Sequence, residues 1–226
     1  MKEIKYLNFP VSFLRKRDLE AVLEQALQFC LFESMVLNNG DRSYFDTLSV
    51  RLGLSGAEFD LFVHSKKLYE ENVKSVRCGV SLEVFINYLR TSKDELNLEF
   101  RAYSATKAVI GNKAYKKTRY REVFSLMFGY TKYEDISEKT KLELSKIEDS
   151  RYMKRLLEKL EQKWHLSIYS LNSRGLYISY KLAPVELIVE VKKSKIIAKK
   201  KQVINEKKAD KILENYINNI ESKSDS

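Results

Sequence analysis

The stretch that decides the fold is Asp149–Lys181, DSRYMKRLLEKLEQKWHLSIYSLNSRGLYISYK. Up to Trp164 its apolar residues recur three and four positions apart, which is the spacing of an amphipathic helix. Two β-prone strings follow, at 165–170 and 176–181, and the residues between them include Asn172, Ser173 and Gly175, which suit a turn with positive φ. The stretch therefore predicts a helix and then a β-hairpin with Arg174 at its tip.

The helix expected over 149–164 has an apolar side and a basic side. The apolar stripe consists of Met153, Leu156, Leu157, Leu160 and Trp164. The basic side chains that project elsewhere are Arg151, Lys154, Arg155, Lys159 and Lys163. Asp149 or Ser150 can cap the first turn. One half of the helix is thus expected to pack, while the other is free to enter a major groove, which is about 12 Å wide and admits one helix.

This helix and hairpin resemble the winged-helix superfamily of DNA-binding proteins, over about residues 98–181. In that superfamily a recognition helix precedes a β-hairpin wing, whose basic tip touches the phosphate backbone or the minor groove. The resemblance implies a groove-facing set and a wing contact, with Asn172 and Ser173 shaping the loop. The groove-facing set would be Arg151, Lys154, Arg155 and Lys159, and the wing contact would be Arg174.

The resemblance also implies that a helix expected over 118–128, capped by Thr118, supports the recognition helix. About twenty residues separate Gly129 from Arg151, whereas the turn of the superfamily is usually short. Either an extra helix is inserted in this connection, or the recognition helix lies elsewhere. The polar segment 131–148 is expected to hold a short, partly exposed helix.

A second basic cluster precedes the hairpin. Between Arg101 and Arg121 there are seven Lys or Arg residues and no acid. The candidate DNA contacts in it are Lys113, Lys116, Lys117, Arg119 and Arg121. Tyrosines interleaved with these residues can stack on exposed bases, although tyrosines at helix junctions are also often half-buried anchors.

The net charge of the whole chain, +10, is concentrated in such clusters. From Lys192 to Ser226 ten lysines accompany only five acidic residues. Clustered cations are expected where a protein displaces counterions from a polyphosphate. A solvated lysine-rich surface without a ligand gives the same composition.

The rest of the sequence predicts mainly helix, because the 226 residues include only seven Gly and two Pro. An extended arm is expected at 8–11 and a helix at 18–37. Helices are also expected at 43–52 and from Ser55, joined by a Gly turn; this spacing fits a helix-turn-helix or a plain helical hairpin. Further helices are expected from Ser81 and from Ser92, and an amphipathic one near the carboxyl end.

We therefore expect a mainly α fold of the α+β class in three parts. Residues 1–91 form a helical unit, residues 92–183 a winged-helix-like unit with a β-hairpin, and residues 184–226 a basic helical tail. The tail can pack on its own domain, join a second protomer or lie on phosphates.

Common catalytic and cofactor motifs are missing from the sequence. Cys30 and Cys78 have no CxxC spacing and are expected to be reduced, buried thiols. His64 and His165 stand outside any metal-binding spacing, and no P-loop is present. We expect no cofactor, no bound metal and no enzymatic activity. Because the sequence has neither a signal peptide nor an apolar run of membrane-spanning length, we expect a cytoplasmic protein without membrane contact.

The function expected from these observations is binding to double-stranded DNA, with a homodimer as an open alternative to a monomer. Tandem units of this kind loosely resemble plasmid replication initiators, and a transcription regulator fits equally well. The competing class is a non-catalytic protein-interaction module, such as an accessory factor of a mobile element, whose basic surface binds an acidic protein partner. A nuclease or strand-transfer enzyme is a third class.

Overall fold

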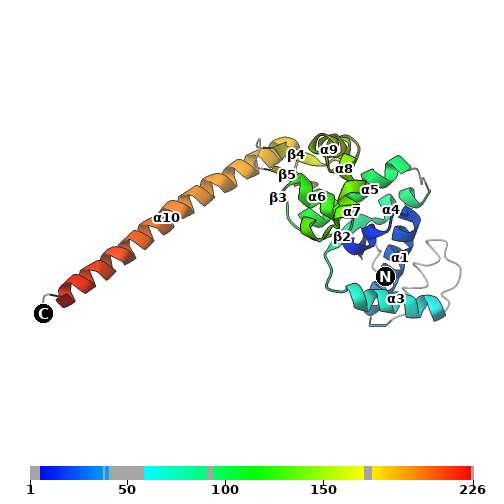
Figure 1. Cartoon of the computed structure of the whole chain (residues 1–226), viewed down its shortest axis with the longest axis horizontal. Helices are drawn as coiled ribbons and strands as arrows, with labels where there is room; N and C mark the ends of the chain where they lie inside the picture. Colours follow the sequence, from blue (N-terminus) through cyan, green and yellow to red (C-terminus); the bar gives the residue numbers. More distant parts are fainter. Residues whose placement is uncertain (1–5, 38, 41–58, 91–93, 171–174, 225–226) are drawn as a thin grey trace.

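The computed structural model describes residues 6–37, 39–40, 59–90, 94–170 and 175–224. The described residues form a mainly helical body with two small sheets, from which a long carboxyl-terminal helix projects (Figure 1). In chain order the elements are β1 (Tyr6–Pro10), η1 (Val11–Arg15), α1 (Leu19–Leu37), α3 (Phe59–Asn72), β2 (Arg77–Ser81), α4 (Leu82–Arg90), α5 (Asp94–Ile110), β3 (Lys116–Thr118), α6 (Tyr120–Met127), η2 (Tyr133–Asp135), α7 (Glu138–Glu143), α8 (Ser145–Glu148), α9 (Ser150–Trp164), β4 (Ser167–Ser170), β5 (Leu176–Ser179) and α10 (Pro184–Ser224).

The mainly α composition with a minor β part is thus confirmed. The helix at 43–52, the Gly turn after it and the capping box at Ser55 fall outside the described residues. So does the predicted boundary at residue 91, and the division into units stays a prediction. The tail is helical from Pro184 onward, as one continuous helix of 41 residues.

The first sheet pairs the predicted extended arm with a strand that was not predicted. β1 runs antiparallel to β2, with Phe9 opposite Cys78. Both cysteines are buried free thiols, as expected. Burial raises the pKa of Cys78 to about 12, and it raises the pKa of Cys30 well above its ordinary value. The two thiols are therefore protonated packing groups at neutral pH.

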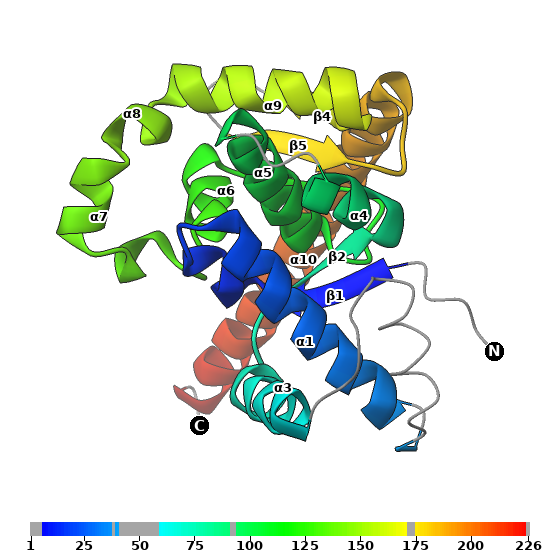
Figure 2. The same cartoon turned by 90° about the vertical axis from the view of Figure 1, so that its right-hand side faces the viewer.

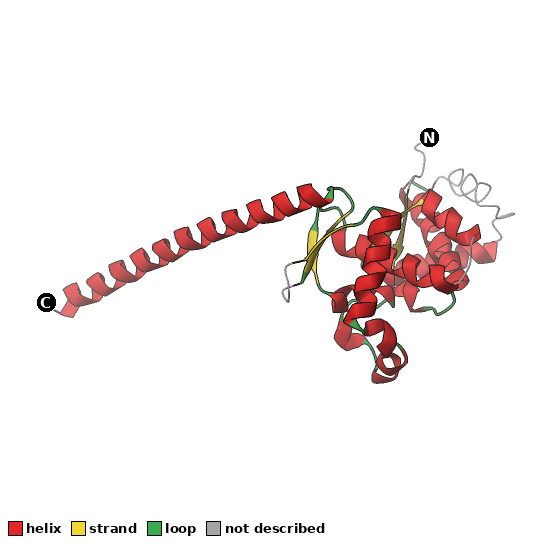
Figure 3. Cartoon of the chain, turned by 90° about the horizontal axis from the view of Figure 1, so that it is seen from above, coloured by secondary structure: helices red, strands yellow, loops and turns green. Residues whose placement is uncertain are grey.

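The second sheet contains three antiparallel strands in the order β3-β5-β4. Leu176 and Ile178 of β5 are buried in the main core, whereas Tyr177 alternates to the other face. The start of α10 packs on β4 and β5 and contacts Tyr177 through Lys195. The sheet is therefore covered on its inner face by the body and on its outer face by α10. Figure 3 shows α10 leaving from the strands.

Helix α5 lies at the centre of the body, beneath α9 and beside α6 (Figure 2). It contacts β2 of the first sheet as well as β3 and β5 of the second. Its middle carries small buried side chains that allow neighbouring elements to come close: Ala102, Ser104, Ala105 and Thr106. The buried apolar residues form one cluster that extends from Leu7 to Ile178. One core therefore joins the two sheets through α5.

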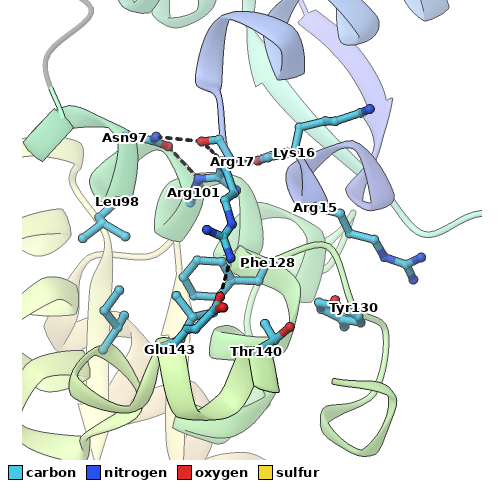
Figure 4. A pocket seen from close by; sticks show the side chains of 12 residues that line it. Arg15, Lys16, Arg17, Asn97, Leu98, Arg101, Phe128, Tyr130, Thr140 and Glu143 are labelled. Atoms are coloured by element: carbon cyan, nitrogen blue, oxygen red, sulfur yellow. Dashed lines mark hydrogen bonds and ion pairs between the residues drawn. The ribbon is translucent and has the colours of Figure 1, made fainter. Parts of the chain in front are cut away.

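The guanidinium of Arg101 on α5 is buried and ties η1 to α6. Its N–H groups donate to backbone carbonyls at the ends of these two segments, those of Leu14, Lys16, Arg17 and Met127. Its Nε also donates to Asn97 Oδ1 at 2.6 Å (Figure 4). Burial lowers the pKa of Arg101 to about 10, which leaves it charged at neutral pH. A cation paired with carbonyl oxygens thus replaces the missing helical hydrogen bonds at these ends.

The pocket in Figure 4 lies in front of this arginine and has a volume of about 400 Å³. An ion pair between Arg17 and Glu143 of α7 crosses it. Behind that ion pair, Leu98, Phe128 and Leu144 line an apolar wall. The pocket is therefore a seam where α7 and α8 dock on the loop after η1.

Replacing Arg101 with Met should destabilise the fold by about 3 kcal/mol or more, because several buried carbonyls lose their donor. Urea unfolding followed by circular dichroism measures this change. Arg17→Ala is the control, since its side chain is 86% exposed and its ion pair with Glu143 should contribute less than about 1 kcal/mol. Equal losses in the two variants would contradict the role given to Arg101.

Candidate nucleic-acid interface

Helix α9 is placed by its buried apolar stripe. Met153, Leu156, Leu157 and Leu160 are buried, as the sequence predicts. Trp164 is half-buried, with its ring centroid 4.4 Å from that of Tyr103 on α5. These contacts fix which side of α9 faces solvent.

The ends of α9 are well defined. Asp149 caps the first turn by accepting hydrogen bonds from the backbone N–H groups of Arg151 at 2.7 Å and Tyr152 at 3.2 Å. At the other end His165 adopts the left-handed conformation, with φ of 54°. The predicted helix and its cap are therefore confirmed, and the capped end carries exposed basic residues.

The basic residues of α9 divide into two groups. Arg151, Lys154 and Arg155 are exposed, and Lys154 Nζ lies 3.7 Å from Glu158 Oε1 on the same helix. Lys159, by contrast, projects toward α5. The structure therefore separates Lys159 from the other candidate groove contacts, although its side chain is still about half exposed.

The partner of Lys159 on α5 is Glu99, a buried carboxylate that the sequence did not single out. Glu99 Oε1 lies 3.6 Å from Lys159 Nζ and 3.1 Å from Lys163 Nζ. Two cations thus compensate one buried charge, and they fix the rotation of α9 about its axis in addition to the apolar stripe. The signal in the sequence was an acid on the packed face of α5, at the position before Phe100.

Helix α6 packs against α9, and its first turn lies near Glu158 of that helix. Burial, and after it the negative charge of Glu158 on α9, raises the pKa of Tyr120 in the first turn of α6. The predicted cap at Thr118 is wrong: Thr118 ends strand β3, and the N-cap residue is Arg119. Thr118 instead donates its hydroxyl to Glu122 Oε2 at 2.7 Å, because pairing with β5 holds its backbone extended.

Two candidate residues, Arg119 and Arg121, are exposed at this end of α6. Arg121 lies 3.9 Å from Glu148 at the end of α8 and stacks over the Tyr133 ring. Arg119 makes no ion pair with any residue in the described part of the chain. The free cation at the start of α6 is thus Arg119, whereas Arg121 helps to hold the connection that leads to α9.

The predicted hairpin is confirmed as β4 and β5, which pair with Ser170 opposite Leu176. Its tip, with Asn172, Ser173 and the candidate Arg174, lies outside the described residues. Leu176 is also opposite Thr118, so the turn of the hairpin and the start of α6 lie at the same end of the sheet. This register places Leu176, the first residue of β5, beside the basic residues of β3 and the start of α6.

Gly175 closes the turn with φ of 97° in close contact with β3. A Cβ at this position would lie 2.7 Å from the carbonyl oxygen of Thr118, 3.7 Å from Lys117 Cε and 3.8 Å from Arg119 Cγ. Lys117 and Arg119 therefore flank the base of the hairpin turn. The sequence did not reveal this arrangement, because β3 is only three residues long and pairs with a strand far along the chain.

The remaining candidates, Lys113 and Lys116, lie farther from the turn. Lys113 is exposed after the end of α5, and Lys116 is half-buried opposite Ile178. The neighbouring tyrosines are anchors: Tyr103 is buried, and Tyr115 and Tyr120 are half-buried. Because these three rings pack within the protein, they present little free surface on which a base could stack.

We use the name basic face for Lys117, Arg119, Arg151, Lys154 and Arg155. Its residues come from β3, α9 and the start of α6, and each is exposed. Exposed cations on helices and strands can pair with the phosphates of an extended polyanion. Glu158 lies among them and would repel phosphate at its own position, so the attraction is strongest at the capped end of α9.

Other kinds of site receive no support in the described residues. Outside the omitted segments, no group of three or more His, Cys, Asp or Glu residues is arranged to hold a metal ion. Both histidines are exposed. No helix in the part of the chain that the structure describes is long and apolar enough to cross a membrane.

No known protein family, no curated protein and no solved structure matches this chain.

Replacing Gly175 with Ala should destabilise the protein by about 2–3 kcal/mol, because the methyl group meets the Thr118 carbonyl in a backbone region that Ala avoids. Gly111→Ala is the matched control, since Gly111 has φ of 55° and no heavy atom within 4 Å of the added Cβ. It should cost about 1 kcal/mol. Denaturant unfolding measures the free energy of unfolding of both variants. If Gly175→Ala loses no more stability than Gly111→Ala, the close packing of Gly175 on β3 is contradicted.

Proposed function

We propose that this chain binds double-stranded DNA through a winged-helix unit in which α9 is the recognition helix. The observation that supports it is the packing of α9: its apolar stripe is buried, and Lys159 and Lys163 form ion pairs with the buried Glu99. Arg151, Lys154 and Arg155 are left facing solvent. Helix surfaces of this kind fit the major groove, where arginine and lysine reach both base edges and phosphates.

The chain order of the elements supports the same proposal. A helix, a short strand and a second helix (α5, β3, α6) precede α9 and the β4-β5 hairpin, and β5 pairs back onto β3. A recognition helix followed by a hairpin wing is the arrangement of the winged-helix superfamily. The segments η2, α7 and α8 occupy the long connection between α6 and α9, which fits the alternative of an insertion.

In this proposal the residues have different roles. Arg151 and Arg155 read base edges near the capped end of α9, because they lie on its outermost side. Lys117, Arg119 and Arg174 pair with phosphates next to the wing, and Lys154 does so beside α6. Base contacts give sequence preference, whereas phosphate contacts give affinity that falls with salt.

Replacing Arg151 and Arg155 with Ala should weaken binding to a preferred site by about 10- to 100-fold each, and binding to random duplex by less, since base contacts are lost. Arg174→Ala should weaken both kinds of duplex to a similar extent. Fluorescence anisotropy at fixed salt measures the two affinities for each variant.

Lys66→Ala is the control for this comparison, because Lys66 is exposed on α3, at the other end of the body from α9 (Figure 2). It should leave both affinities unchanged. The roles assigned to α9 would be rejected if Arg151→Ala and Arg155→Ala bound as well as Lys66→Ala.

The role in the cell that fits this activity is non-enzymatic: a replication initiator-like protein or a transcription regulator. In this proposal the chain acts in the cytoplasm and binds duplex DNA without a small-molecule cofactor. A cleavage assay with Mg²⁺ and supercoiled DNA tests the competing nuclease class, and no nicking is expected.

The second candidate is a protein-interaction module that forms a homodimer through α10. The observation in its favour is a set of exposed apolar side chains on that helix: Val189, Ile196, Ile197, Ile204 and Ile212. Light scattering distinguishes this alternative, which requires a mass of twice 26.5 kDa at micromolar concentration. A mass that stays at the monomer value would contradict this second candidate. It would not bear on DNA binding.

A further inference from the structure

Helix α10 leaves the body after about two turns. Leu187 and Val191 are buried against the second sheet, and beyond them every side chain that the structure describes, up to Ile212, is exposed. Figures 1 and 3 show the helix extending far from the rest of the molecule. Packing within this chain therefore accounts only for the beginning of α10.

The exposed part begins with a basic segment, Lys192–Lys201. It contains six lysines and no acid: Lys192, Lys193, Lys195, Lys199, Lys200 and Lys201. Lys193 pairs with Glu190 at 3.1 Å, and the other five make no ion pair with any residue that the structure describes. Like charges three and four positions apart destabilise a helix. A segment of this kind is stabilised by a polyanion that lies along it.

Three of these lysines form a row on one side of the helix. Lys192, Lys195 and Lys199 are spaced three and four residues apart, so they lie one above the other. Because an α-helix rises about 1.5 Å per residue, the row from Lys192 to Lys199 is about 10 Å long. This length corresponds to about three base pairs of a duplex. The row therefore has the dimensions of several consecutive phosphate contacts.

The beginning of the row lies near Lys117, the member of the basic face that belongs to the second sheet. Lys195 Nζ lies 6.0 Å from the centroid of the Tyr177 ring, and Tyr177 is directly opposite Lys117 in the sheet register. Tyr115, just before β3, also bonds to Ser194 of α10, with 2.5 Å between the hydroxyl oxygens. These contacts hold the beginning of the basic segment on the sheet face that carries Lys117.

We infer that the row Lys192, Lys195 and Lys199 of α10 is a second phosphate-binding surface for the duplex DNA that α9 binds. It adds affinity without sequence preference, because lysines on a phosphate backbone do not read bases. This inference rests on the proposed function and deepens it: α10 lengthens the bound stretch of DNA on the side of the wing.

The test is the salt dependence of duplex binding by the full chain with Lys192, Lys195 and Lys199 changed to Gln. The slope of log K against log salt should become shallower by about 2.7, which is about 0.9 for each lost phosphate contact. The ratio of affinities for a preferred and a random duplex should not change. Circular dichroism of the variant shows whether α10 stays helical.

The matched control changes Lys207, Lys208 and Lys211 to Gln in the same helix, where Glu206 and Asp210 stand among the lysines. Its slope should stay at the wild-type value. An unchanged slope in the first variant overturns the inference, as does an equal reduction in both variants, which would indicate a general effect of charge.

The failure of this inference differs from the failure of the proposed function. If wild-type protein binds duplex with an ordinary salt dependence that the first variant preserves, only the role of α10 is wrong. If wild-type protein retains no duplex at all at low salt, DNA binding itself is wrong and the inference falls with it.

Discussion

The buried guanidinium of Arg101 is the interaction on which the rest of the structure depends. It lies in the middle of α5, where it holds the end of η1 and the end of α6 through their carbonyl oxygens. Carbonyls left without donors in a core are costly, so one cation satisfies several groups that the helical geometry leaves unpaired. The same helix also contacts β2 of the first sheet and β3 and β5 of the second sheet.

Helix α5 then orients α9 through a second buried charge. Glu99, two residues before Arg101, forms ion pairs with Lys159 and Lys163 on one side of α9. The apolar stripe of α9 is buried in the core. The remaining side of α9 is held toward solvent with its arginines. The surface that we propose for DNA is thus oriented by a buried carboxylate on α5 and by the apolar stripe of α9.

The sequence was sufficient for the elements with a strong local signal. The leucine spacing of α9, a cap at Asp149 or Ser150 and the two strands of the hairpin are set by neighbours within a few residues, and all were predicted. Strands β2 and β3 were missed because five or three residues carry no periodicity, and their partners lie far away in the chain. The cap of α6 was misplaced by one residue for the same reason, since pairing with β5 keeps Thr118 extended.

The candidate site was predicted in its composition more than in its arrangement. Exposed Arg151, Lys154 and Arg155 follow from the helical period alone. Two features depend on tertiary contacts that no local pattern encodes. Lys159 forms an ion pair with the buried Glu99, and Lys117 and Arg119 lie beside Gly175. The sequence thus shows how many charges the chain carries, whereas the fold decides which of them are exposed and unpaired among the described residues.

Selection from a random duplex library tests the central claim most directly. The full chain would be incubated with the library near physiological salt, and the retained fragments would be sequenced. A recognition helix in the major groove predicts enrichment of one short motif that recurs among independent fragments. Retention of no duplex would contradict the account, and retention without any shared motif would contradict the role of α9.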